Sequence, residues 1–394
     1  MGATGTPMTA DARLAINASI VGGNPTGLGI YTIKLVRALD EIRNDFFVYA
    51  SSAVSFGSLR APIGRVPRAT RPDYGGRGHV IRLLWLQGAL RLWLSKTRPE
   101  GLLNTVPEGI LRSPVPQITV VHDLLPLRFP PEYPRQQYYF RFLVPRILVD
   151  SHLVIADSEH TRSDILDHYD VPADKVKVIY PGYDSSAFFF GGPDLSPQLR
   201  RDPYILYVGN LLPHKNIPRL LDAFALLRRR RSCRLIIRGE GRPGYARLLR
   251  QRIESLGLRE AVTFAGYAGE DSLRRLYSDA VCLVLPSLGE GFGLPVLEAM
   301  ACGTPVITAS ASSLPEVAGD AALMVDPYDA LGLADAMYGT LTDGDLREDL
   351  RRRGLERVSA FSWKRTALEV SRLLDGTVGS SGTPAPALPL HDRA

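Results

Sequence analysis

The chain has 394 residues, of which 45% are hydrophobic and 22% are charged, and its formal net charge at pH 7 is +6. This length is too great for one ordinary core and predicts two domains. The composition is that of a globular protein without an apolar run long enough to span a bilayer. A basic surface suits anionic partners, but no nucleic-acid-binding signature accompanies it, so we expect no nucleic acid partner.

The first half of the chain alternates short apolar strands with helical stretches, after a disordered extension expected over residues 1–11. The expected strands cover residues 14–18, 46–50, 101–104, 118–122, 153–156 and 176–180. The expected helices between them include residues 30–40, 80–95 and 136–150. This pattern predicts a Rossmann-like N-terminal domain over residues 12–190, followed by a linker rich in glycine and proline over residues 191–203.

The helix expected over residues 80–95 carries Trp85 and Trp93 together with Arg82, Arg91 and Lys96. Such a helix could lie in a membrane interface or pack on a sheet. Because its apolar residues lie nearly all round the helix, we favour packing. Peripheral contact with the inner face of the cell membrane remains an open alternative.

The second half repeats the strand and helix pattern and predicts a second Rossmann-like domain over residues 204–360. The expected strands cover residues 205–208, 235–237, 262–264, 281–285, 306–308 and 322–325, with helices over residues 217–229 and 245–254 among those between them. Residues 361–375 are expected to form a helix that crosses back to the N-terminal domain, before a disordered tail over residues 376–394. The fold class is therefore α/β, with two doubly wound domains facing a cleft.

The three cysteines, Cys233, Cys282 and Cys302, are few and odd in number, and two of them lie in apolar runs. This usage indicates small core residues in a reducing compartment, so we expect the protein in the cytoplasm.

A glycine-rich loop follows the strand expected at residues 281–285, and it opens a helix that has Pro295 in its first turn and ends at Gly303. In open α/β sheets, ligands bind at the carboxyl ends of the strands, and the amides of a helix N-terminus favour a phosphate group. Two carboxylates, Glu290 and Glu298, lie in this stretch. The pattern is typical of a sugar-nucleotide site.

A plainer interpretation makes Glu290 a solvated loop residue and Glu298 a first-turn acid that complements the helix dipole. The glycines around Glu290 weigh against it, because Gly289, Gly291 and Gly293 cost backbone entropy and imply a close approach of the backbone to something. We therefore favour the ligand site.

Lys215 lies at the turn between the strand that Gly209 ends and the next helix. A lysine there is a compact charge suited to a diphosphate, although a surface lysine without a ligand is the alternative. The stretch is neither a P-loop nor a dinucleotide fingerprint. In the first domain, Gly27 and Gly29 follow the first strand and open a helix, where backbone amides can approach an anion.

His122 ends the fourth strand, where its side chain can hydrogen-bond a substrate hydroxyl or phosphate. The alternative is a pair of His122 with Asp123 that ties the strand end to its own loop. The other histidines show no metal-ligand spacing. Asp343-Gly344-Asp345 is interpreted as the start of a helix, so we expect no metal.

Taken together, these residues resemble the family 4 retaining glycosyltransferases, which have the GT-B fold. The strongest match is the family's Glu-x7-Glu motif, from Glu290 to Glu298. The stretches 181–184, 209–216 and 313–317 and Ser287 also match. The amino-acid sequences of residues 121–124 and 209–216 are most similar to those of bacterial mannosyltransferases that act in O-antigen and related surface glycans.

The resemblance implies a role for each part of the site. Glu298 would hold the ribose hydroxyls of the nucleotide, and Glu290 the hydroxyls of the donor sugar. Lys215 would stabilise the leaving diphosphate, and His122 would contact the donor sugar near the reacting carbon. The remaining donor-binding residues by resemblance are Gly27, Gly29, Gly209, Asn210, Phe292, Gly293 and Leu294. Many members have a basic residue where this chain has Asn210, which leaves less positive charge for the leaving group.

The expected reaction is a metal-independent, retaining transfer of a hexose, by resemblance mannose from GDP-mannose, to a saccharide or lipid-linked acceptor. No other cofactor is expected. A UDP-sugar-dependent glucosyl or N-acetylglucosaminyl transferase of the same family is the first alternative. A sugar-nucleotide epimerase lacks this loop, and a non-catalytic GT-B scaffold is opposed by the intact charged residues.

Overall fold

The computed structural model describes residues 13–23, 25, 27–51, 54–191, 202–266 and 270–379. The expected N-terminal extension, nearly all of the linker at 191–203 and most of the tail expected at 376–394 lie outside the described residues, whereas residues 376–379 continue the last helix. Contacts divide the chain into two compact units. One runs up to Thr119 and adds Asp150–Leu153 and the residues from Ala367, and the other comprises Val120–Val149 and Val154–Thr366.

The first sheet has seven strands in the order β3-β2-β1-β4-β5-β6-β7. Its strands are β1 (Leu14–Asn17), β2 (Phe46–Ala50), β3 (Ile63–Arg65), β4 (Gly101–Asn104), β5 (Gln117–Val121), β6 (Leu153–Ala156) and β7 (Val176–Val178). Strands β1 to β5 pair in parallel, as do β6 and β7. The strand β3 was not expected, because three residues centred on a glycine show almost no alternation of apolar and polar side chains.

The helices associated with this sheet lie between its strands in the chain, apart from the last one. They are α1 (Gly27–Ile42), α2 (Gly75–Trp85), α3 (Arg91–Thr97), α4 (Leu125–Arg128), α5 (Gln136–Phe142), α6 (Val144–Asp150), α7 (Glu159–His168) and α16 (Trp363–Gly379). In the first unit, Arg43 donates to Ser371 and Asp375 of α16 at 2.9 and 3.2 Å. These bonds tie the last helix to the end of α1.

Two expected helices are interrupted. The helix expected over residues 80–95 contains a π-helical turn at Leu86–Leu90, which separates α2 from α3. Trp93 stacks on Phe47 with ring centroids 6.0 Å apart, so the packing interpretation of this helix is confirmed. The helix expected over residues 136–150 divides into α5 and α6, because Pro145 has no amide to continue the hydrogen-bond ladder.

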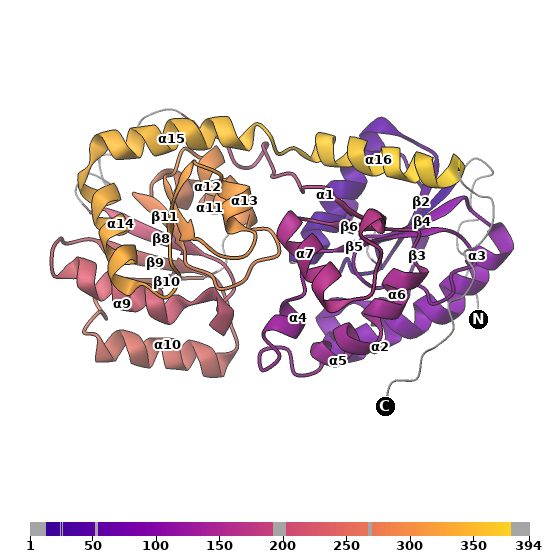
Figure 1. Cartoon of the computed structure of the whole chain (residues 1–394), viewed down its shortest axis with the longest axis horizontal. Helices are drawn as coiled ribbons and strands as arrows, with labels where there is room; N and C mark the ends of the chain where they lie inside the picture. The colour runs from indigo at the N-terminus through magenta and orange to yellow at the C-terminus, as the bar shows by residue number, and fades with distance from the viewer. Residues whose placement is uncertain are drawn as a thin grey trace. The chain divides into compact units, whose positions relative to one another are not determined.

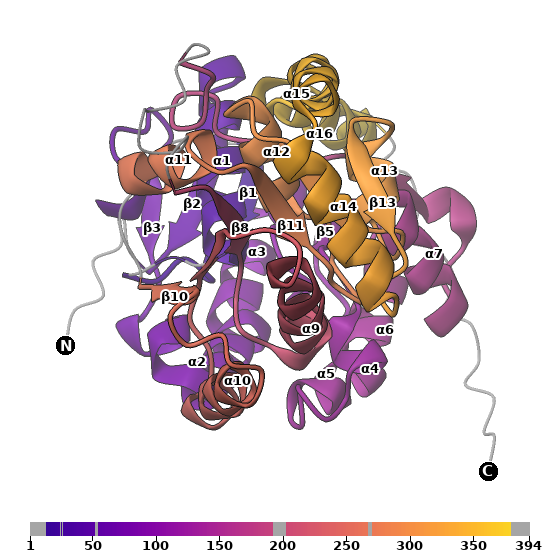
Figure 2. The same ribbon diagram turned by 90° about the vertical axis from the view of Figure 1, so that its left-hand side faces the viewer.

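The second sheet has six parallel strands in the order β10-β9-β8-β11-β12-β13. They are β8 (Tyr204–Val208), β9 (Arg234–Arg238), β10 (Val262–Ala265), β11 (Cys282–Leu285), β12 (Val306–Ala309) and β13 (Ala322–Val325). The helices are α9 (Ile217–Arg228), α10 (Pro243–Ser255), α11 (Glu270–Ser278), α12 (Leu294–Ala301), α13 (Leu314–Ala318), α14 (Ala330–Thr342) and α15 (Gly344–Val358). Helices α9 and α10 lie on one side of this sheet and α12 and α15 on the other (Figures 1 and 2).

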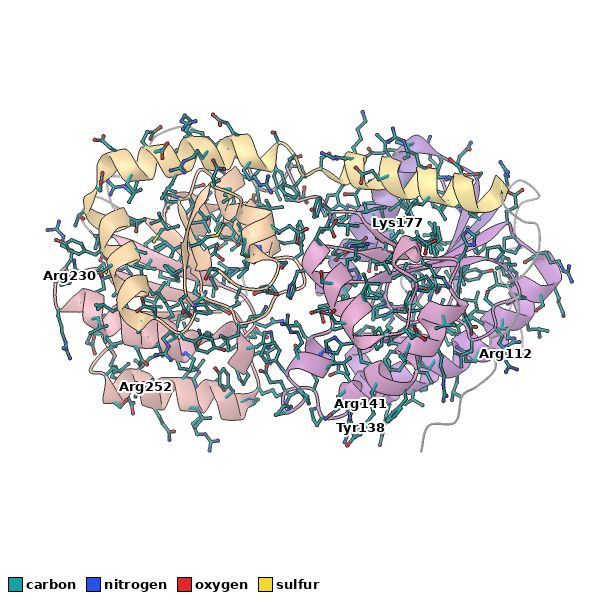
Figure 3. The ribbon with its side chains drawn as sticks, viewed as in Figure 1. Arg112, Tyr138, Arg141, Lys177, Arg230 and Arg252 are labelled. Carbon is teal, nitrogen blue, oxygen red and sulfur yellow. The ribbon has the colours of Figure 1, made fainter. Side chains whose placement is uncertain are left out.

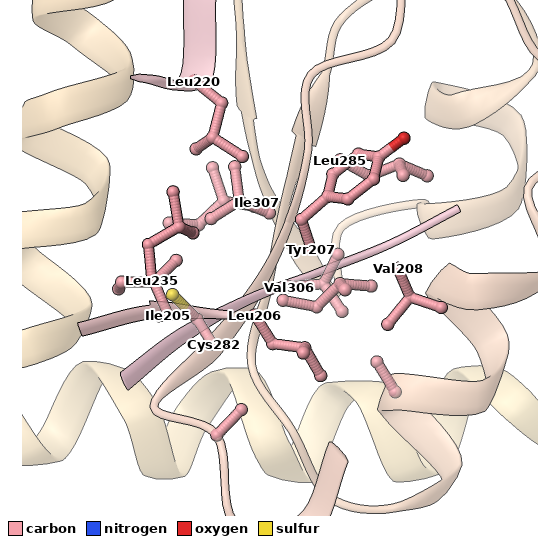
Figure 4. Packing of buried hydrophobic residues seen from close by; sticks show 14 of the residues in the cluster. Ile205, Leu206, Tyr207, Val208, Leu220, Leu235, Cys282, Leu285, Val306 and Ile307 are labelled. Atoms are coloured by element: carbon pink, nitrogen blue, oxygen red, sulfur yellow. The ribbon is translucent and has the colours of Figure 1, made fainter. Parts of the chain in front are cut away.

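The core of the second sheet consists of fully buried strand residues packed against the helices on both faces (Figure 4). Leu206, Leu235, Cys282 and Ile307 are 2% exposed or less. All three cysteines of the chain are buried and free, as their apolar surroundings predict. Among the described residues, no helix is both long and apolar enough to cross a membrane.

Candidate functional site

The strand order of the second sheet reverses between β8 and β11, which are neighbours in the sheet although three helices and two strands separate them in the chain. Ligands of open α/β sheets bind outside the carboxyl ends of the strands at such a point. Gly209 follows β8 there, and Ser287 follows β11. The two loops singled out in the sequence therefore lie at the same edge of the sheet.

Lys215 and Glu290, 75 residues apart, form an ion pair at this edge. Lys215 ends the turn Pro213–Lys215 before α9, and its Nζ lies 2.6 Å from Oε2 of Glu290. Ser287 donates to the other oxygen, Oε1, at 2.7 Å. The side chains are only 14% and 11% exposed. The alternatives of a surface lysine and a solvated glutamate are therefore wrong.

The backbone of the Glu290 loop is held by two serines that precede α13. The Glu290 amide donates to Oγ of Ser312 at 3.0 Å, and that hydroxyl donates to the Glu290 carbonyl at 2.7 Å. The Ser313 hydroxyl contacts the Phe292 carbonyl at 3.0 Å. These bonds from the segment before α13 hold the backbone of the Glu290 loop. They explain why the stretch 313–317 belongs to the same site.

Two glycines of the loop are required by its geometry. A Cβ at Gly291 would lie 2.4 Å from the His122 carbonyl oxygen, so only glycine permits this approach. Gly293 has a φ of +106° and forms the N-cap of α12, with Pro295 in the first turn. The Phe292 ring is buried beside Tyr180, so its backbone is the part that can meet a ligand. The helix starts at Leu294, in agreement with the sequence.

Glu298 lies on α12, where its Oε2 accepts a hydrogen bond of 2.8 Å from the hydroxyl of Tyr277. Tyr277 is fully buried, and burial together with the Glu298 charge raises its pKa well above the ordinary value. Tyr277 therefore remains a hydrogen-bond donor that orients the carboxylate. Nothing in its local sequence distinguishes this tyrosine from a core residue.

His122 is 7% exposed, and its Nδ1 lies 2.6 Å from Oδ2 of Asp157. The carboxylate partner is thus Asp157 and not the adjacent Asp123, whose Oδ1 accepts from the Leu125 amide. Burial raises the pKa of Asp123. Asp157 follows β6 directly, so its place at the carboxyl edge of the sheet was the available signal in the sequence.

Side chains of the same unit also hold the glycine loop beside His122. The hydroxyls of Ser158 and Thr161 donate to the Gly291 carbonyl at 3.1 and 3.3 Å. The Thr161 hydroxyl also lies 3.2 Å from the His122 carbonyl oxygen, so its single proton is shared between the two carbonyls. The residues from β5, α7 and the Glu290 loop therefore form one connected polar network.

Asn210 is exposed and supplies no charge, but a buried cation lies at the same edge of the sheet. Arg238 ends β9 and is 6% exposed, and its carbonyl accepts from the Gly209 amide at 3.0 Å. Its positive charge acts on Tyr277 by lowering the pKa of that phenol against the larger effect of burial. A charged residue at the end of an apolar strand was a signal that the sequence reasoning missed.

Gly27 and Gly29 belong to the other unit, at the start of α1. A Cβ at Gly29 would lie 3.0 Å from Cβ of Pro25, whereas Gly27 faces open space. Asp343 caps α15 by accepting from the Leu346 amide, which confirms that this stretch starts a helix. Within the described residues, no group of three or more His, Cys, Asp or Glu side chains is placed to hold a metal ion.

Two parallel sheets of this order define the architecture of the GT-B glycosyltransferases. Residues 25–187 match the model of Glycosyltransferase Family 4, and residues 196–357 match that of Glycosyl transferases group 1. The chain is 30% identical over 361 residues to the O-antigen chain mannosyltransferase B of Escherichia coli, covering 86% of this chain and 93% of that one. It therefore belongs to the family 4 glycosyltransferases.

A second relative is the O-antigen chain mannosyltransferase RfbU of Salmonella typhimurium, which is 32% identical over 325 residues, 80% of this chain and 87% of that one. Among solved structures, that of Anabaena HepE in complex with UDP-glucose is similar, with a TM-score of 0.73 and 18% identity. The alignment covers 92% of this chain and 99% of that one. At this identity the structural likeness shows the fold.

Proposed function

We propose that the protein transfers mannose from GDP-mannose, with retention of configuration, to a saccharide or lipid-linked acceptor during the synthesis of a surface polysaccharide or glycoconjugate. The observation that carries the proposal is the Lys215–Glu290 pair, set in the loop before α12 where β8 and β11 adjoin. The similarity to two O-antigen mannosyltransferases supports the sugar and the process.

Lys215 is proposed to stabilise the leaving diphosphate. Its ammonium group has three donors, and among the described residues one of them is directed to Glu290, so the other two can serve phosphate oxygens. Cleavage of the sugar–phosphate bond develops negative charge on the diphosphate, which a fixed cation and the N-terminus of α12 both favour. Arg238 adds positive charge at the edge where Asn210 supplies none.

The carboxylates are proposed to bind hydroxyl groups, Glu290 those of the donor sugar and Glu298 those of the ribose. Glu290 already accepts a hydrogen bond at each oxygen, which supports a binding role over a nucleophilic one. We propose that His122, whose Nδ1 lies 2.6 Å from Oδ2 of Asp157, contacts the donor sugar near the reacting carbon. We therefore propose front-face attack by the acceptor, assisted by the leaving phosphate.

A thermal-shift panel of GDP- and UDP-sugars tests the donor. A ligand at a hundred times its Kd stabilises the folded state by about 2.7 kcal/mol, and GDP-mannose should give the largest shift. A larger shift with a UDP-hexose would identify that sugar nucleotide as the donor in place of GDP-mannose. No shift with any nucleotide sugar would favour a non-catalytic scaffold. If Glu298→Ala leaves transfer intact, the assigned site is wrong.

Two further measurements test the stereochemistry of the transfer and its independence of a metal ion. The anomeric configuration of the product, read by NMR before mutarotation, should equal that of the donor. Transfer should continue in EDTA, because Lys215, Arg238 and the helix N-terminus supply the positive charge. An inverted product or a loss of activity that Mg²⁺ or Mn²⁺ restores would contradict this part of the proposal.

A cytoplasmic location with peripheral contact at an anionic membrane completes the proposal. The exposed side of α5 and the start of α6 carries Arg135, Tyr138, Arg141, Phe142 and Arg146, and Figure 3 shows Tyr138 and Arg141 directed away from the core. Tyr138 and Phe142 are 58% and 56% exposed, and α5 contains no acidic residue. Aromatic rings beside arginines suit an anionic lipid surface. Sedimentation with anionic but not zwitterionic vesicles, lost in a Tyr138→Ser/Phe142→Ser variant, tests the contact.

A further inference from the structure

A buried histidine–carboxylate pair lies directly before Lys215 and has no place in the chemistry proposed above. His214 is 1% exposed and Glu132 is 8% exposed. Nδ1 of His214 lies 2.6 Å from Oε2 of Glu132, and the backbone amide of His214 donates to Oε1 at 2.9 Å. One carboxylate therefore holds both the ring and the backbone of the residue that precedes Lys215.

His214 is also the point where three segments of the same unit meet. The Leu288 amide, in the loop that carries Glu290, donates to the His214 carbonyl at 2.7 Å. The Phe129 ring stacks on the imidazole with centroids 5.1 Å apart. Arg242 donates to the Glu132 carbonyl at 2.8 Å, which fixes the segment that supplies the carboxylate. The turn with Lys215 and the loop with Glu290 are thus joined through one residue.

The charges around the imidazole favour its neutral form. Glu132, Glu290 and Asp123 face His214 with negative charge and Lys215 faces it with positive charge. Burial and Lys215 lower the pKa of His214. The bond to Glu132 then requires the proton on Nδ1, whereas the buried Nε2 has no hydrogen-bond partner among the described residues. A neutral ring leaves Lys215 as the cation of this turn.

We propose that Glu132 and His214 are positioning residues, which hold the turn Pro213–Lys215 against the Glu290 loop so that the Lys215 ammonium keeps its place during transfer. Stabilisation of a developing charge depends on donors held within fractions of an ångström, which a buried two-point clamp provides. This inference rests on the proposed transfer reaction and adds residues that act through Lys215 without touching the donor.

The variant Glu132→Gln tests the clamp, because glutamine keeps the volume but has one acceptor oxygen for two donors. We expect hydrogen exchange in peptides covering residues 211–216 and 286–290 to accelerate at least tenfold. We expect kcat to fall at least tenfold while the Kd of the donor changes less than threefold. His214→Asn, whose amide can replace Nδ1–H, should keep more activity than His214→Leu and provides a second route if Glu132→Gln folds poorly.

A control is Glu108→Gln in the other unit, which alters a buried glutamate that lies 2.9 Å from Nδ1 of the partly exposed His79 and also pairs with Arg82. It should leave exchange at residues 211–216 unchanged. In a Lys215→Met background, Glu132→Gln should lower kcat no further, because the two residues act through one another.

Each outcome decides the proposal. Unchanged exchange in Glu132→Gln, or faster exchange with an unchanged kcat, overturns it, as does an additive effect with Lys215→Met. If the wild-type protein transfers no sugar from any nucleotide donor, the proposed reaction is wrong. The exchange measurement then decides by itself whether Glu132 holds the turn.

Discussion

Replacing Lys215 by methionine should separate the catalytic role of this residue from its structural one. Methionine has a similar length and no charge, so it removes the 2.6 Å ion pair with Glu290 while nearly preserving the packing of the side chain. The change leaves Glu290, 11% exposed, with Ser287 as its remaining side-chain donor among the described residues.

Two magnitudes follow from this geometry. Removing one fixed electrostatic donor to a developing charge lowers kcat by about 10²–10³. Leaving a partly buried carboxylate without its cation costs about 1–3 kcal/mol of the free energy of unfolding. The kinetic effect should therefore appear in kcat at saturating donor, at temperatures well below the unfolding transition.

The assay combines urea unfolding with steady-state kinetics on the folded protein. Lys177→Met is the matched control, because Lys177 is an exposed lysine on β7 that forms no ion pair within the described residues, and it should change neither quantity (Figure 3). The reasoning is refuted if Lys215→Met loses stability yet keeps kcat within threefold of the wild-type value. In that case Lys215 stabilises the Glu290 loop and does not stabilise the leaving diphosphate.

Three further changes test other parts of the site. Tyr277→Phe removes the 2.8 Å bond to Glu298, so calorimetry should show weaker donor binding and urea unfolding a loss of about 1.5 kcal/mol. Gly291→Ala places a Cβ 2.4 Å from the His122 carbonyl, so thermal unfolding should show a loss of about 1–3 kcal/mol. The pKa of His214 is lowered on folding, so the unfolded chain takes up the proton first below pH of about 6.5. The free energy of unfolding should therefore decrease as the pH falls through that window, and His214→Asn should remove this part of the dependence.

The elements that could be predicted are those whose signal is local. Strands β2, β4 and β6 have the predicted bounds, because each is a short apolar run closed by polar or turn residues. The start of α12 was predicted from Pro295 in its first turn, since a fixed φ is a property of a single residue. The π-helical turn at Leu86–Leu90 was missed. A π-helical turn differs from an α-helix in its backbone hydrogen bonds, but its apolar residues recur with nearly the same period in the sequence.

The amino-acid sequence by itself determined that a glycine-rich loop with Glu290 opens a helix at the carboxyl end of a strand, and that Lys215 lies at another such turn. Periodicity, turn chemistry and helix capping act over a few residues and can be seen in one chain. The tertiary structure decided which groups meet: Lys215 with Glu290, His122 with Asp157 and His214 with Glu132. These partners are 35 to 82 residues apart. Strand order brings together the first two pairs, because β8 adjoins β11 and β5 adjoins β6, whereas Glu132 reaches His214 from the loop between α4 and α5.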